Sequence, residues 1–341
     1  MKKFNNRFKI NNFEFLRLAC AIQVMLSHAN SEYIGKYFYI NYFPGLPIFF
    51  FISGYLVFAS YDNCKSIKFF YLNRILRIYP GLVFASVVGL VLIIIITSTY
   101  PSDQSYYLEY FKWFFYQISL GQSYNPYYIE QQINWVTWTI TVEILFYLIV
   151  PIFFINKKLI NHLVFYFFCL SIIYCIFFAK LEKNYIYYLN LTPLRFGWFF
   201  MIGSFFYLNF DFFYKYKKYL IFAIIPMLLM ISSGSSNILF KSQTSGSDLG
   251  FLYFFCLASI CFYFVYSFNY KIFKLKFDFS YGIYLFHTLI FNYLWVLLGF
   301  SNLFLVVSFT FALSIFSWFW IEKPFLQMKI NNIKKPSKIS F

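Results

Sequence analysis

Long apolar stretches separated by short polar connections make up most of this chain. Each is roughly 15 to 22 residues long, about the length that crosses 30 Å of hydrocarbon as a helix. A segment in lipid must satisfy its own backbone hydrogen bonds, so the pattern predicts helices despite many β-branched and aromatic residues. The stretches are 12–32, 43–61, 79–98, 135–155, 160–179, 191–210, 219–233, 249–268, 279–298 and 302–320. We therefore expect an all-α integral membrane protein, with about ten transmembrane helices in one bundle.

The connections between these stretches predict a single-domain organisation. We expect one transmembrane domain over 1–328, followed by a basic cytoplasmic tail over 329–341 without fixed structure. The longest outer connection, 99–134, is predicted to hold an interfacial helix at about 107–120. No motif is found in this segment or in the loop 233–248. The weakest predicted span is 219–233, because it is short and contains Pro226.

Charge changes this picture by fixing an orientation. Only 12% of the residues are charged, about half the usual share for a soluble domain, while the net charge is +16. Lys and Arg gather in alternate connections and at both ends, with 21 on one side against 5 on the other. The positive-inside rule then places both termini in the cytoplasm. The excess of positive charge is thereby explained by topology, and no nucleic-acid partner is expected. The six cysteines lack the spacing of a disulfide framework or a metal site.

Ionisable side chains inside spans are costly and usually mark function. Arg17 and His28 lie 11 residues apart in the first span. Helical geometry puts them on one face, about 16 Å apart along the axis. Such a face suits a long anionic co-substrate, with its phosphates at one end and its reactive group at the other. The simpler alternatives are a snorkelling arginine and a hydrogen-bonded structural histidine.

Three further charged residues stand out by position. Glu143 lies a third of the way into an apolar span. A carboxylate there needs either a proton or a cationic partner. The expected partner is a histidine or an arginine of another helix. Arg74 and Arg77 are spaced i,i+3 at a predicted helix entrance, just before Pro80. They either grip phosphate or anchor the helix at the cytoplasmic surface.

Seven short blocks stand in order along the chain. They are FEFLRLACAIQVMLSH (13–28), GLPIFFFISGY (45–55), RILRIYP (74–80), WTITVEILFYLIVP (138–151), LRFGWFFMIG (194–203), SYGIYLFH (280–287) and IEKP (321–324). Together they resemble the acyltransferase-3 family of membrane proteins. Glu14 stands where the family usually has Asp in the first block, and Ser53 and Gly54 occupy their family positions in the second. Each block is weak alone, but their order over nearly the whole chain makes the resemblance specific.

This resemblance implies an enzyme of a bacterial inner membrane that moves an acyl group from acyl-CoA to a hydroxyl. The donor is expected to be acetyl-CoA, used as a co-substrate, and no metal is expected. The acceptor is expected to be a sugar hydroxyl of a cell-envelope polysaccharide, such as O-antigen, or of a lipid-linked sugar. The family histidine corresponds to His28. The family arginines that act in donor binding correspond to Arg17, Arg74 and Arg77.

These residues suggest a mechanism. An alcohol is a poor nucleophile, whereas a thioester is already activated, so the enzyme needs a base, positioning and oxyanion stabilisation. His28 is the expected base, with Glu143 orienting it. The candidate donors to the oxyanion or acceptor are Ser53, Arg195 and Tyr284. An acyl-histidine intermediate fits the sequence equally well. For His287 we expect a structural role.

Two other classes of membrane protein fit the sequence less well than this enzyme. A polysaccharide transporter or flippase without catalysis should show repeated halves and helices broken at midplane, and neither pattern is found. A glycan polymerase or other glycosyltransferase does not account for the His28 and Glu143 blocks. A GxSxG hydrolase and an HExxH zinc enzyme are excluded because the chain contains neither motif.

Overall fold

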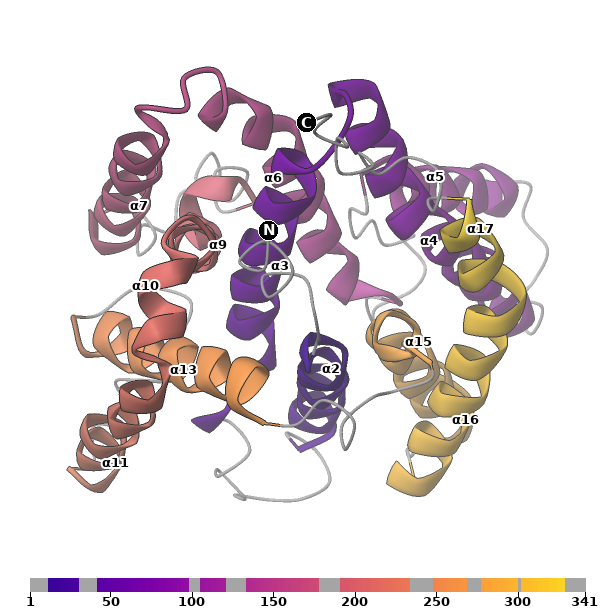
Figure 1. Cartoon of the computed structure of the whole chain (residues 1–341). Helices are drawn as coiled ribbons and strands as arrows, with labels where there is room; N and C mark the ends of the chain where they lie inside the picture. The colour runs from indigo at the N-terminus through magenta and orange to yellow at the C-terminus, as the bar shows by residue number, and fades with distance from the viewer. Residues whose placement is uncertain are drawn as a thin grey trace. The chain divides into compact units, whose positions relative to one another are not determined.

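The described residues of this protein form helices and contain no strand, as the apolar pattern predicts. The computed structural model describes residues 12–30, 42–97, 105–120, 133–177, 191–233, 248–268, 277–299 and 302–328. The α-helices of at least nine residues are α2 (Phe13–Asn30), α3 (Gly45–Asp62), α4 (Ile67–Thr97), α5 (Ser105–Leu120), α6 (Trp138–Phe153), α7 (Ile160–Phe177), α9 (Pro193–Leu208), α11 (Ile224–Ser232), α13 (Asp248–Ser267), α15 (Ser280–Leu298) and α16 (Leu303–Phe316) (Figure 1).

Six helical segments in the described part of the chain are long and apolar enough to cross a membrane. They are Gly45–Asp62, Ile67–Ile95, Trp135–Phe153, Ile160–Phe177, Gly250–Ser267 and Leu303–Gln327. The four other predicted spans fall on α2, α9, α11 and α15, which do not meet this combined criterion of length and apolarity among the described residues. A multi-pass membrane protein is therefore supported. The total of ten spans and the cytoplasmic termini stay predictions.

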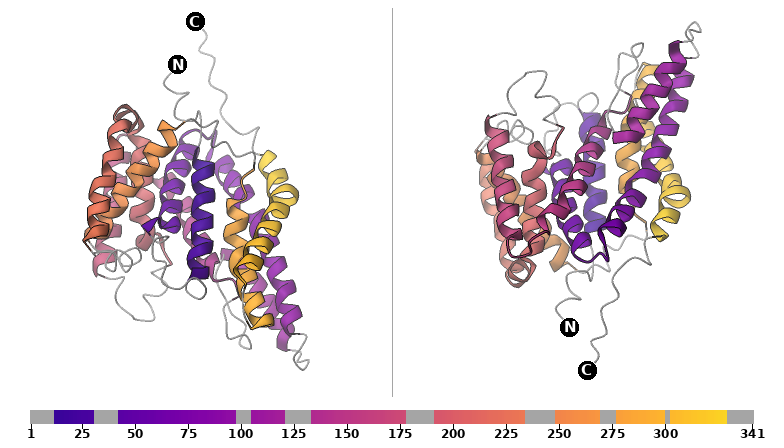
Figure 2. Two further views of the ribbon diagram at one scale, coloured as in Figure 1. Left: turned by 90° about the horizontal axis from the view of Figure 1, so that it is seen from below. Right: turned by 90° about the horizontal axis from the view of Figure 1, so that it is seen from above.

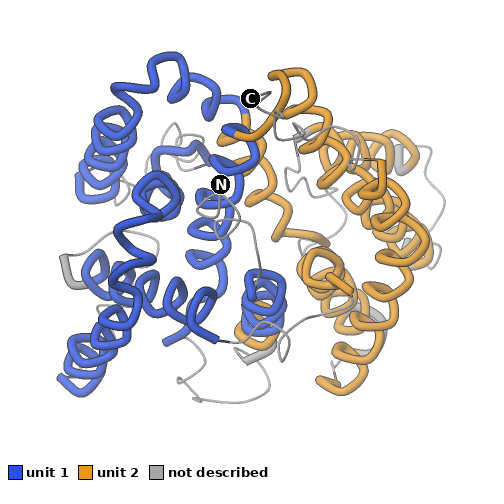
Figure 3. Tube along the Cα trace, in the orientation of Figure 1, with its two compact units in different colours: residues 1–23, 38–62, 148–276 blue, residues 24–37, 63–147, 277–341 orange. Residues whose placement is uncertain are grey.

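Contacts divide the chain into two compact units (Figure 3). Unit 1 comprises the described parts of Met1–Gln23, Phe38–Asp62 and Leu148–Lys276. Unit 2 comprises the described parts of Val24–Tyr37, Asn63–Tyr147 and Phe277–Phe341. Helix α2 contributes its first part to unit 1 and its last part to unit 2. The predicted tail, 329–341, lies outside the described residues, as do 99–104 and 121–132 of the predicted outer segment and 234–247 of the predicted loop 233–248.

In unit 1, α3 and α9 approach each other closely at two glycines. A Cβ added to Gly54 would lie 1.9 Å from the carbonyl oxygen of Phe200, and one added to Gly203 would lie 2.0 Å from that of Phe51. Both obstacles are backbone atoms, so neither can rotate away. Small residues allow this approach between membrane helices, which associate mainly through van der Waals packing. The glycine of the ISGY block therefore has a packing role.

We expect Gly54→Ala and Gly203→Ala each to destabilise the protein by about 3 kcal/mol, because α3 and α9 must separate to admit the methyl group. The measurement is the midpoint of thermal unfolding in detergent. Phe205→Ala is the control, since Phe205 is also on α9 but 41% exposed, and it should cost about 0.5 kcal/mol. Glycine variants with the midpoint of the control would contradict this account of the packing.

Helix α4 of unit 2 corrects one sequence-based boundary. A span was expected from residue 79, with Arg74 and Arg77 at its entrance, but α4 begins at Ile67 and continues through Pro80. Proline removes one intrahelical hydrogen bond, a loss that neighbouring helices can compensate in membrane proteins. Near this proline, the Tyr281 hydroxyl donates to the carbonyl oxygen of Ile78 at 3.0 Å. Both arginines therefore belong to the body of a 31-residue helix.

Two other regions differ from their predicted form. The stretch 219–233 is split into a 3₁₀ helix, Lys217–Ala223, and the nine-residue α11, because Pro226 cannot donate to the carbonyl of Phe222. The last predicted span continues from α16 into a π-helical segment, Ser317–Glu322, and then into α17 (Lys323–Gln327). In the predicted outer segment 99–134, α5 is helical as expected and runs alongside α4 (Figure 2). Its interfacial position stays a prediction.

Candidate active site

His28 lies in the last turn of α2, where it meets a second histidine. Its Nδ1 is 2.8 Å from Nε2 of His287, and the two rings stack with 5.0 Å between centroids and 18° between planes. The ring of Trp135 covers His28 at a centroid distance of 4.4 Å. His28 is half-buried, whereas His287 is 1% exposed. The half-buried ring of His28 therefore contacts the fully buried imidazole of His287.

The ring nitrogen that carries the proton in each histidine follows from the groups to which the rings hydrogen-bond. Nδ1 of His287 lies 3.0 Å from the carbonyl oxygen of Ile283, one turn earlier on α15. A carbonyl oxygen only accepts, so Nδ1 of His287 carries a proton and, in the neutral ring, Nε2 is an acceptor. The bond between the rings then requires a proton on Nδ1 of His28. The lone pair of neutral His28 is left on its Nε2.

One face of α15 fixes the segment that carries Trp135. Three side chains at every fourth position hydrogen-bond to residues 133–139. Tyr284 OH lies 2.7 Å from Thr139 Oγ1 and donates to the Val136 carbonyl at 3.2 Å; Thr288 donates to Asn134 at 3.0 Å, and Asn292 donates to the Ile133 carbonyl at 3.1 Å. The helix that carries His287 therefore also holds the aromatic ring against His28.

Glu143 lies on α6, where its carboxylate accepts a hydrogen bond from Tyr147, one turn later. The guanidinium of Arg74 lies 5.4 Å from the centroid of the Tyr147 ring. The carboxylate is also near enough to Tyr284 of α15 for electrostatic interaction. Glu143 thus belongs to a polar group that includes an arginine side chain from another helix. Its expected role in orienting His28 stays a prediction.

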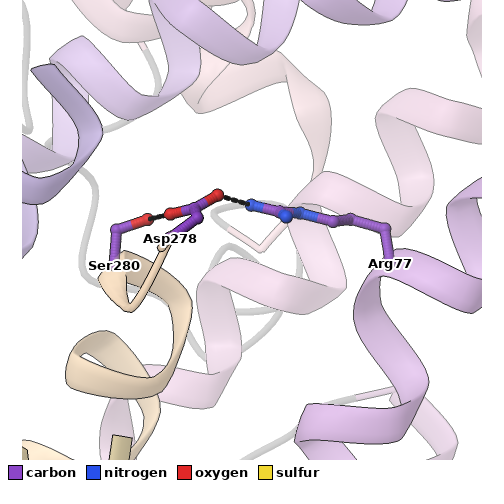
Figure 4. Close-up of polar contacts among 3 residues, drawn as sticks. All are labelled: Arg77, Asp278 and Ser280. Carbon is purple, nitrogen blue, oxygen red and sulfur yellow. Dashed lines mark hydrogen bonds and ion pairs between the residues drawn. The ribbon is translucent and has the colours of Figure 1, made fainter. Parts of the chain in front are cut away.

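Arg77 has a carboxylate partner that the sequence analysis missed. Its Nη2 lies 2.8 Å from Oδ2 of Asp278, and the other oxygen of Asp278 accepts from Ser280 at the start of α15 (Figure 4). Asp278 lies two residues before the first residue of the SYGIYLFH block and close to the basic loop 271–276, so no motif singled it out. Arg77 also interacts electrostatically with Glu322, which is 2% exposed and accepts from Ser317. The charge of Arg77 is therefore matched by acidic groups of the same unit.

The remaining candidates belong to unit 1. Arg17 is half-buried on α2, and Ser53 is half-buried on α3, next to Gly54. Arg195 is half-buried on α9, with its guanidinium 5.5 Å from the ring centroid of Phe196. The structure thus groups His28, Glu143, Arg74, Arg77 and Tyr284 in unit 2 and the other three candidates in unit 1.

His287, for which the sequence predicted a structural role, is the contact partner of His28. A signal was present, because His287 is ionisable, lies in an apolar stretch and ends one of the seven blocks. Its distance of 259 positions from His28 hid the pairing. Among the described residues, no group of three or more His, Cys, Asp or Glu side chains is arranged to hold a metal ion. Imidazoles accept and donate protons, so the pair of histidines can take part in proton transfer.

Comparison with known proteins gives two matches. A family model described as an acyltransferase domain, Acyl_transf_3, matches residues 10–323. Nodulation protein 10 of Rhizobium leguminosarum bv. viciae is 35% identical over 161 residues. That alignment covers 41% of this chain and 43% of the relative, so it spans less than half the length of either protein. No solved structure matches the chain.

Proposed function

Because the chain belongs to the acyltransferase-3 family, as the match over residues 10–323 shows, we propose that it is a membrane-bound O-acyltransferase. It moves an acyl group, acetyl in our proposal, from acyl-CoA to a hydroxyl of a cell-envelope polysaccharide or lipid-linked sugar. We place it in the inner membrane of a bacterium. The observation that carries the proposal is the hydrogen bond between His28 and His287, which leaves the lone pair of His28 on Nε2.

The proposed transfer begins with the acceptor hydroxyl. Nε2 of His28 takes its proton while the oxygen attacks the thioester carbonyl carbon. The tetrahedral intermediate then collapses, the carbon–sulfur bond breaks, and the leaving thiolate takes the proton from the imidazolium. The products are the ester and coenzyme A. An acyl-histidine intermediate at His28 is the second route, and it uses the same lone pair as a nucleophile.

In this proposal, the other candidate residues bind acyl-CoA or stabilise the charges that develop during the reaction. Arg17, Arg74 and Arg77 hold the phosphates of acyl-CoA, since guanidinium groups bind phosphate oxygens through paired donors. The Asp278 bond engages one Nη of Arg77, and a guanidinium has five N–H donors in all. Glu143 stabilises the positive charge that develops on His28. Ser53, Arg195 and Tyr284 are the candidate donors to the oxyanion or the acceptor.

Tyr284→Phe tests which role the tyrosine hydroxyl has. The hydroxyl already lies within hydrogen-bond distance of Thr139 and the Val136 carbonyl, so its role is to hold the segment 133–139 in place. We expect its removal to raise the activation free energy by about 1 kcal/mol, which lowers kcat roughly fivefold. An oxyanion donor would cost about 10²- to 10³-fold instead. The measurement is kcat for acyl transfer in reconstituted protein. A loss above 100-fold would reject the positioning role and assign Tyr284 to the oxyanion.

The function is tested by direct transfer. Purified protein in liposomes is incubated with acetyl-CoA labelled in the acetyl group and with envelope glycan from a strain that lacks this gene. We expect label in the glycan and free thiol in equal amounts. Glycan moved across the bilayer without label would support the transporter or flippase alternative. The surface glycan of the host should also lose one acetyl mass increment when the gene is removed.

A further inference from the structure

We infer that His287 is a positioning residue that fixes the proton of His28 on Nδ1 and so presents a basic Nε2 to the acceptor hydroxyl. This inference rests on the proposed function. It replaces the structural role that the sequence suggested for His287. It is carried by two contacts, 2.8 Å from ring to ring and 3.0 Å from His287 to the Ile283 carbonyl.

Both ring nitrogens of His287 have assigned partners, which a simple packing role does not require. His287 is 1% exposed, and an apolar side chain would fill such a site without the cost of burying two polar nitrogens. The carbonyl of Ile283 belongs to the same helix, so α15 itself sets the tautomer of His287. That tautomer in turn sets the tautomer of His28, because the contact between the rings needs one donor and Nε2 of His287 is the acceptor.

The same bond assists the reaction as charge develops. When Nε2 of His28 takes the acceptor proton, the ring becomes cationic and its Nδ1–H becomes a stronger donor. His287 stays neutral and keeps its acceptor lone pair directed at that proton. The hydrogen bond is therefore stronger in the transition state than in the ground state, which is the condition for an effect on kcat. No proton has to move through His287.

Three substitutions separate positioning from packing. His287→Gln reaches the position of Nε2 and can accept from His28. His287→Asn ends near the position of Nδ1 and cannot, while His287→Leu only fills space. A carboxylate partner that fixes the tautomer contributes about 10⁴-fold, and we expect less from a neutral imidazole. We predict a loss of about 100-fold in kcat for Asn and Leu and about tenfold for Gln, with KM for acetyl-CoA unchanged.

The tautomers can be observed without an assay of activity. The chain has three histidines, so ¹⁵N-labelled histidine in protein reconstituted into bilayers gives three ring spin systems. His162→Gln and His28→Gln variants assign them. At a pH where the rings are neutral, we expect the proton on Nδ1 in both His28 and His287, with coupling between the two rings. A proton on Nε2 of His28 would overturn the inference.

The two proposals fail in different ways. If the wild-type protein transfers no acyl group, the proposed function is rejected, and the ¹⁵N spectra still test the predicted tautomers. If the wild type is active and the Asn and Leu variants keep kcat within threefold, the positioning role is rejected and the function stands. A variant that does not fold is recognised by size-exclusion chromatography, and the wild-type spectra then decide.

Discussion

His28→Ala is expected to lower the rate of acyl transfer by about 10³-fold, because it removes the group that accepts the proton of the attacking hydroxyl. The methyl group of alanine cannot replace the Nε2 lone pair. The measurement is the initial rate of label transfer at saturating acetyl-CoA in reconstituted protein. KM for acetyl-CoA should change by less than threefold, because His28 is not assigned to the phosphates.

The chain supplies its own control for this substitution. His162 lies on the exposed surface of α7 in unit 1, and His162→Ala should keep the wild-type rate within twofold. Both variants should elute as folded protein, since α2 loses one half-buried side chain in the first case. If His28→Ala kept a rate within tenfold of wild type, His28 would be neither the base nor the acylated residue. The proposed mechanism would then be rejected.

Asp278→Ala is expected to destabilise unit 2 by about 3 kcal/mol, because it leaves the partly buried guanidinium of Arg77 without its carboxylate. The side chain of Arg77 keeps 20% of its surface exposed and that of Asp278 keeps 9%. Partial exposure of the arginine sets our estimate at the low end of the range for buried pairs. The measurement is the midpoint of thermal unfolding in detergent, compared with that of the wild type.

Two further variants identify the cause of that loss. Ser280→Ala removes a hydroxyl hydrogen bond to the same charged carboxylate (Figure 4) and should cost about 1.5 kcal/mol. The double variant Arg77→Met/Asp278→Leu removes both charges, so it should recover most of the stability lost by Asp278→Ala. A double variant that is no more stable than the single one would show that the ion pair is not the cause.

The same double variant tests the donor-binding role of Arg77. If Arg77 also contacts a phosphate of acyl-CoA, the folded double variant should show a KM for acetyl-CoA raised about tenfold, the effect of losing a charged hydrogen bond. An unchanged KM would limit Arg77 to its structural pair with Asp278. This comparison separates the two roles because the stability of the double variant is measured independently.

The helix boundaries show where sequence reasoning stopped. Apolar length predicted the helical class and placed most helices within a few residues of those observed. It misplaced the start of α4, because the apolar stretch begins near Pro80, whereas α4 begins at Ile67 and continues through this proline. It also missed the π-helical segment that ends at the buried Glu322. Local pattern alone cannot show whether a helix ends at a proline or continues through it.

The candidate site shows the same limit for side chains. Sequence alone singled out His28, Glu143, Arg74 and Arg77, because charge inside an apolar stretch is costly enough to need a reason. It predicted a cationic partner for Glu143 but did not identify Tyr147. It gave His28 no partner from α15 and gave Arg77 no carboxylate. Those pairings join residues 259 and 201 positions apart, and nothing in the local pattern encodes such contacts.

The sequence by itself determined that this is a helical protein with segments suited to lipid, and which residue types carry its chemistry. The physical reason is that burial of charge and of backbone polar groups in lipid is expensive at each position separately. Only the tertiary structure decided which nitrogen of His28 carries the lone pair. That depends on the hydrogen bond between His28 and His287, which lie on helices far apart in the sequence. The direction of a hydrogen bond belongs to a pair of residues, and the pair exists only in the folded chain.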